Sequence, residues 1–68
     1  MTTRQAAKLI QSGQTVTLRT FFNKVFEGKI VDQNRHDLMI EHVWQGNLQI
    51  GIFDRFDVQI VPADSNLA

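Results

Sequence analysis

The 68-residue chain contains no cysteine, a single proline and only two histidines. The absence of cysteine excludes disulfides and Cys-based zinc sites, and His36 and His42 lie in unlike contexts that do not make a metal site. A chain of this length buries only about 60% of its unfolded surface, so its core is small. We therefore expect self-association or an unusually economical fold to stabilise it, without a metal or a cofactor.

An excess of charge of either sign is also missing. Seven basic and seven acidic residues give a formal net charge of zero, which weighs against non-specific coating of nucleic acid, because such binding depends on neutralising phosphates. It leaves room for a local basic patch. The longest apolar run is too short to span a bilayer, and the first residues lack the apolar segment of a secretory signal. We therefore expect a soluble, cytoplasmic protein with no membrane partner.

The sequence also lacks the signatures of common enzymes. It has no nucleophile elbow, phosphate-binding loop, dinucleotide fingerprint or zinc motif. Asp32 and Asp37 could be imagined as an acid and base pair, but a polar loop offers no apolar pocket of the kind that tunes catalytic carboxylates. We therefore do not expect an enzyme.

Residues 2–12 have the pattern of a short amphipathic helix. Thr2 can act as the N-cap, and Gln5 follows at the spacing of a capping box. Gly13 suits the left-handed position that ends a helix. The expected apolar face consists of Ala6, Leu9 and Ile10. A helix this short is not stable alone, so it must pack on another element.

From Gln14 onward, the apolar period changes to two, which is typical of strands. The five expected strands cover residues 15–20, 25–31, 38–43, 48–53 and 58–62. Gly28 falls on the inward face of the second strand, where a glycine permits a strong bend, and Gly46 suits a tight turn. We therefore predict a mainly β fold: an N-terminal helix followed by a strongly bent, five-stranded antiparallel sheet or small SH3-type barrel. Residues 1–62 form a single domain, and residues 63–68 a frayed tail.

Three stretches carry a resemblance to the Sm-like family, which includes the LSm and Hfq-type RNA-binding proteins. "VTLRTFFNKVFEGKI" is similar to the first half of the Sm1 motif, with Gly28 two positions before the aliphatic Ile30. "DQNRHDLMIE" resembles the second half, with Asn34 where the family usually has aspartate, and "IFDRFDVQIVP" resembles the Sm2 region. The resemblance covers roughly residues 2–62.

This resemblance implies a homo-oligomeric ring of six or seven copies, in which the fourth strand of one copy pairs with the fifth strand of the next. Such a ring binds single-stranded, U-rich RNA near its pore and can act as an RNA chaperone. The positions that match the RNA-binding residues of the family are Asn34, Arg35, His36, Phe53 and Arg55. Arg35 and His36 match residues that flank or stack on a base, and Phe53 is expected beneath Arg55.

Other interpretations stay open. Asp54 stands where several relatives are basic, and Val25 and Glu27 do not reproduce the pattern of A-rich RNA binding. Residues 32–37 could be a solvated hairpin loop, with Arg55 in an ordinary ion pair. The chain could then be a small SH3-like or Sm-fold barrel that acts as a structural or protein-interaction module without RNA binding.

Overall fold

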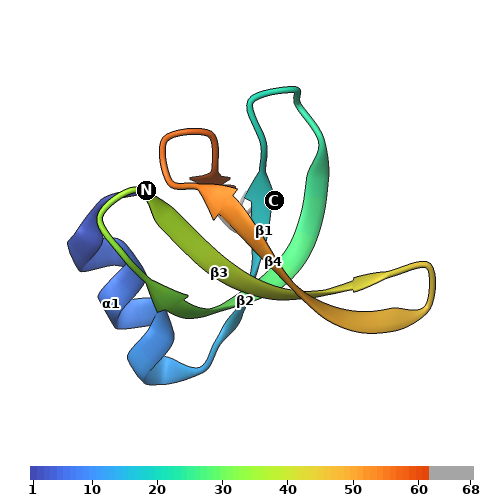
Figure 1. The fold of residues 1–68 in the computed structure, drawn as a ribbon, viewed down its shortest axis with the longest axis horizontal. Helices are drawn as coiled ribbons and strands as arrows, with labels where there is room; N and C mark the ends of the chain where they lie inside the picture. The colour runs from blue at the N-terminus through green and yellow to red at the C-terminus, as the bar shows by residue number, and fades with distance from the viewer. Residues whose placement is uncertain (62–68) are drawn as a thin grey trace, which may run out of the picture.

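The computed structural model describes residues 1–61, which form one helix and a five-stranded antiparallel sheet (Figure 1). The elements are α1 (Thr3–Ser12), β1 (Thr15–Arg19), β2 (Val25–Gln33), β3 (Asp37–Trp44), β4 (Asn47–Asp54) and β5 (Gln59–Ile60). The predicted helix and five strands are therefore confirmed. The expected frayed tail, residues 63–68, and the proline before it lie outside the described residues. No helix in the described part of the chain has the length and apolar character needed to cross a bilayer.

Local signals define both ends of α1. The Thr2 hydroxyl accepts a hydrogen bond from the Gln5 N–H at 3.1 Å, and the Gln5 side chain accepts one from the Thr2 N–H at 3.0 Å, so the predicted capping box is present. Gly13 has a φ of 68° and donates its N–H to the Leu9 carbonyl at 3.0 Å. The helix packs on β2 and buries Ala6. It therefore covers one part of the sheet and places its first turn near the end of β2.

The strand order of the sheet is β4-β3-β2-β1-β5. The strands β4 and β5 form its two opposite edges, so the sheet is not closed into a barrel, and this part of the prediction is wrong. The strand β5 spans only Gln59–Ile60, and it pairs with β1 through the partners Leu18↔Ile60 and Arg19↔Gln59. A strand this short cannot also span the distance to β4, which has eight residues. The closure of a barrel needs strands long enough to pair on both sides.

Apolar side chains from the helix, the sheet and the last turn make a small core. The buried residues are Ala6, Leu18, Ile30, Leu38, Ile40 and Val58. Gly28 lies among them, opposite Val16 on β1 and His42 on β3. A Cβ atom at this position would lie 2.6 Å from the Cγ2 atom of Ile40. The predicted inward position of Gly28 is therefore confirmed, and the close approach of β3 explains why a larger residue does not fit.

Two hairpin turns project from the sheet. The turn between β3 and β4 has positive φ angles at Gln45 (52°) and Gly46 (80°), which is the pattern of a tight two-residue hairpin. Figure 1 shows this hairpin extending away from α1. The turn between β1 and β2 carries Phe21 and Phe22, whose side chains are 74% and 84% exposed. The turn between β1 and β2 thus presents apolar side chains to solvent.

Candidate nucleic-acid interface

The loop between β2 and β3 is short and is ordered by Asn34. The strand β2 extends to Gln33 and β3 begins at Asp37, so only residues 34–36 connect them. The side-chain oxygen of Asn34 accepts the N–H groups of His36 at 2.9 Å and Asp37 at 2.8 Å, which is an Asx turn. The Asn34 N–H donates in turn to the Asp37 carbonyl at 3.0 Å. The backbone of the loop is therefore held, while the side chains of Arg35 and His36 are exposed.

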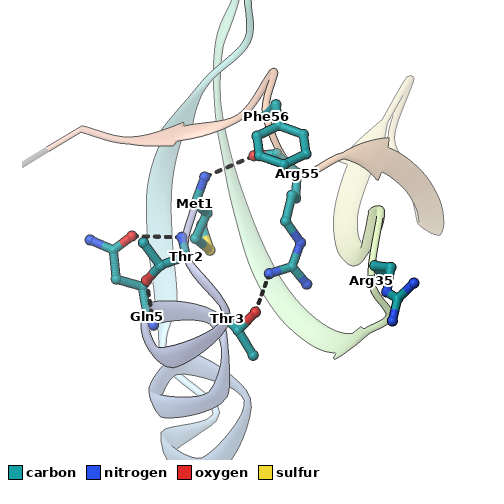
Figure 2. Close-up of a pocket in the computed structure, with 7 residues that line it drawn as sticks. All are labelled: Met1, Thr2, Thr3, Gln5, Arg35, Arg55 and Phe56. Atoms are coloured by element: carbon teal, nitrogen blue, oxygen red, sulfur yellow. Dashed lines mark hydrogen bonds between the residues drawn. The ribbon is translucent and has the colours of Figure 1, made fainter.

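Arg55, in the turn between β4 and β5, fixes this loop from the other side. Its side chain is only 5% exposed. One terminal nitrogen, Nη1, donates to the Thr3 hydroxyl at 2.8 Å, as Figure 2 shows. The other, Nη2, donates to the Gln33 side chain at 2.7 Å and to the Asn34 carbonyl at 2.5 Å. Arg55 therefore links the start of α1, the end of β2 and the β2–β3 loop.

The backbone around Arg55 makes the same connection. The Arg55 N–H donates to the His36 carbonyl at 3.0 Å. The α-amino group of Met1 donates to the carbonyl groups of Arg55 at 2.8 Å and Val58 at 3.2 Å. Burial, and then the nearby charge of Arg55, lower the pKa of this amino group below its usual value of 8.0. Three segments that are distant in the sequence thus meet at Arg55.

A surface hollow of about 400 Å³ lies beside Arg55 (Figure 2). Its lining consists of Met1, Thr2, Thr3, Gln5, Arg35, Arg55 and Phe56. In Figure 2, Arg35 stands on one side, Met1 and Thr2 on the other, and the Arg55 side chain between them. The hollow therefore combines the first turn of α1 with two of the predicted RNA-binding residues.

Four of the five predicted site residues lie together, and Phe53 lies apart from them. Asn34, Arg35 and His36 share the loop that Arg55 contacts. Phe53 stacks instead on Phe26, with ring centroids 5.4 Å apart. The expectation that Phe53 would lie beneath Arg55 came from the resemblance to the Sm-like family. The strand β4 ends at Asp54, and the turn directs Arg55 toward α1.

One interpretation of the sequence placed Arg55 in an ordinary ion pair, and its observed partners differ from that. All three side-chain hydrogen bonds of Arg55 go to uncharged acceptors. Its guanidinium is buried and both terminal nitrogens donate hydrogen bonds, so it is poorly placed to stack under a base. The exposed groups that can contact a flat or anionic ligand are Arg35 and His36.

Sequence reasoning missed two sets of contacts, one at the site and one away from it. Thr3 and Gln33 hold Arg55 from positions 52 and 22 residues away, a contact for which the sequence carries no local signal. His42 forms an aromatic cluster with Phe26 and Phe53, at 5.6 Å from each. The alternation of β2, β3 and β4 places these three rings on one face of the sheet, so period-two patterns contained a signal for this cluster.

Residues 1–61 thus define a small β-rich domain that consists of one short helix and an open, five-stranded antiparallel sheet. No family model, curated protein or solved structure matches the chain. Its function is therefore inferred from its own residues and contacts.

Proposed function

We propose that the chain is a cytoplasmic, Sm-like RNA-binding protein that assembles into a homo-oligomeric ring and binds single-stranded, U-rich RNA. The observation that carries this proposal is the β2–β3 loop. Its backbone is held by Asn34 and Arg55, while Arg35 and His36 are exposed beside each other. A fixed backbone lowers the entropy that these side chains lose when they bind a ligand.

Arg35 and His36 supply the chemistry that single-stranded RNA requires. Unstacked bases pack on flat side chains, and an imidazole ring or a guanidinium plane provides such a surface. Arg35 can also pair with a phosphate oxygen. In this proposal Arg55 and Asn34 are positioning residues, because their side chains hold the loop.

The edges of the sheet support assembly into a ring. Among the described residues, β4 and β5 each have one side without a partner strand. The edge strand β4 exposes Leu48, Ile50 and Ile52 by 67%, 62% and 69%. In the turn that precedes β5, Phe56 is 76% exposed. If β4 of one copy pairs with β5 of the next, a single type of heterologous contact covers both edges. Repetition of this contact gives a closed ring when the rotation between neighbouring copies is suitable.

A ring also resolves the difficulty of a neutral chain that binds RNA. One Arg35 and one His36 from each copy would repeat around the pore, so a strand that contacts several copies gains avidity without a new type of contact. A ring that holds single-stranded segments in this way could act as an RNA chaperone.

Two measurements test the proposal. Light scattering after size exclusion gives the number of copies, and fluorescence anisotropy with labelled oligo-U and oligo-A at low salt gives the affinity. We expect His36→Ala to weaken oligo-U binding about tenfold, because an aromatic ring under a base contributes about 1–3 kcal/mol. The fold should persist, since only the backbone of His36 makes hydrogen bonds. Arg19→Gln, an exposed site on β1, is the control.

The absence of oligo-U binding at low salt would refute the RNA function even if a ring forms. A stable monomer at working concentration would refute the ring.

One observation favours the second candidate, a protein-interaction module that does not bind RNA. Asp37 and Asp54 lie directly opposite each other on β3 and β4, next to the loop. Two carboxylates at this position repel a phosphate that comes near them. If the chain forms a ring but binds neither oligonucleotide, and Asp54→Asn does not restore binding, this second function is the better conclusion.

A further inference from the structure

The buried charge of Arg55 has no carboxylate partner within residues 1–61. The acceptors of its guanidinium are a hydroxyl, an amide oxygen and a backbone carbonyl. Its Nε atom is buried without any hydrogen-bond partner. The neighbouring carboxylate, that of Asp54, accepts the Phe56 N–H at 2.8 Å instead. A buried positive charge without a counterion is costly, so the site attracts an anion.

Further positive groups line the same hollow. The guanidinium of Arg35 and the α-amino group of Met1 lie on opposite sides of it (Figure 2). Within residues 1–61, no carboxylate lines it. The hollow of about 400 Å³ is therefore electropositive in a chain whose net charge is zero.

The first turn of α1 adds hydrogen-bond donors to this hollow. The capping box uses the Gln5 N–H, and the Ala6 N–H donates to the Thr2 carbonyl. Of the residues of this turn that line the hollow, Thr3 keeps an N–H group without an acceptor among residues 1–61. The turn contains no acidic residue, although acidic groups are favoured at the positive end of a helix dipole. Backbone donors at such an end are a common anion-binding arrangement.

We propose that this hollow binds a phosphate monoester dianion, either as free phosphate or as the terminal phosphate of an RNA strand. Arg35 and the hydroxyl hydrogen of Thr3 contact the phosphate oxygens, and the Arg55 charge lies behind them. A terminal phosphate carries a charge of about −1.5 to −2, which matches several cationic groups better than a diester does. The RNA form of this proposal rests on the proposed function, whereas the free-phosphate form does not.

The first experiment uses inorganic phosphate as the probe. Thermal unfolding is compared in phosphate and in chloride at equal ionic strength and equal protein concentration. We expect Tm to rise by about 6–11 °C when phosphate reaches ten times its Kd. Titration calorimetry should show an affinity about tenfold weaker for Arg35→Gln. Arg19→Gln, which removes the same charge outside the hollow, should match the unchanged chain.

Equal unfolding temperatures in phosphate and chloride would overturn the proposal. An equal loss of phosphate affinity in Arg35→Gln and Arg19→Gln would overturn it too, because it would show only a response to net charge.

The second experiment compares three oligo-U strands of six nucleotides each. The first carries a 5′-phosphate, the second a 3′-phosphate, and the third hydroxyl groups at both ends. We expect one of the two phosphate-ended strands, either the 5′ or the 3′ form, to bind about tenfold more tightly than the hydroxyl-ended strand. Free phosphate should abolish this difference in affinity. Equal binding of all three strands, without stabilisation by inorganic phosphate, would overturn the phosphate site and leave the RNA function standing. Phosphate stabilisation without binding of any strand would support the site for free phosphate and refute the RNA function.

Discussion

Replacing Gly28 by alanine adds a single methyl group to β2 at a buried position that β3 approaches closely. The new Cβ would lie 2.6 Å from the Cγ2 atom of Ile40 and 3.3 Å from the backbone carbonyl oxygen of Glu41. Carbon atoms in ordinary contact are about 3.5–4.0 Å apart. The strands must therefore separate by about 1 Å, or Ile40 must move.

Neither adjustment is easy. Ile40 is fully buried, and the Glu41 carbonyl belongs to the backbone of β3. Overpacking of this kind costs about 1–3 kcal/mol, and the lower entropy of the unfolded alanine chain offsets about 0.4–1 kcal/mol of it. The free energy of unfolding should therefore fall by about 1–2 kcal/mol. This is a large part of the total stability, because a single core of this size supplies only about 3–5 kcal/mol.

Urea unfolding followed by far-UV circular dichroism measures this loss. For a small domain with an m value near 1 kcal/mol/M, the midpoint should fall by about 1–2 M. The protein concentration must be kept constant, because any assembly makes stability depend on it. Ile40→Leu removes the clashing Cγ2 atom, so we expect the double variant Gly28→Ala/Ile40→Leu to recover part of the stability.

Gly51→Ala is the matched control. A Cβ there would meet the ring atoms of Phe53 at 2.8 Å and His42 at 3.0 Å. Both side chains are only half-buried, and their rings can rotate. Its cost should therefore be below about 1 kcal/mol, since the contact is relieved by side chains alone. If Gly28→Ala costs no more than Gly51→Ala, or if Ile40→Leu recovers nothing, the steric explanation for Gly28 is refuted.

Three further outcomes follow from the contacts around α1. Thr2→Ala breaks the capping box and should lower the free energy of unfolding by about 1 kcal/mol, measured by urea unfolding. An unchanged midpoint would show that the cap does not contribute. Arg55→Ala removes three hydrogen bonds and should cost about 2–4 kcal/mol, whereas the exposed Arg19→Ala should stay within about 0.5 kcal/mol. Equal effects would contradict the role of Arg55 as a link between segments. Because the native pKa of the Met1 amino group lies below 8.0, the unfolded chain binds more protons between the two values. Stability should therefore rise with pH across that window and level off above about pH 8. Nα-acetylation of Met1 should remove this rise of stability with pH. If the rise persists in the acetylated chain, another group causes it.

The helix and the hairpins could be predicted because their signals are short in range. The capping box joins Thr2 and Gln5, three positions apart, and Gly13 and Gly46 adopt their left-handed conformations within single turns. The period-two pattern located all five strands, although β2 runs two residues beyond its predicted end at residue 31. The predicted barrel failed for a different reason, because closure depends on the length of β5, and the last strand extends over only two residues.

The candidate site divides in the same way. The loop at residues 34–36 follows from a polar break between two apolar runs, so its exposed Arg35 and His36 could be named from the sequence. The environment of Arg55 could not, because its partner Thr3 is 52 residues away and the contact exists only once α1 packs on β2. The resemblance to the Sm-like family placed Phe53 beneath Arg55, but β4 ends at Asp54 and Phe53 stacks on Phe26 instead.

The amino-acid order by itself determined the helix, the five strands, the tight turns and the inward position of Gly28, because each depends on neighbours within a few residues. Only the tertiary structure decided that the sheet stays open and that Arg55, which is buried and has no carboxylate partner among the described residues, joins the loop to the helix. Those features depend on which distant segments meet, and local periodicity does not encode that information.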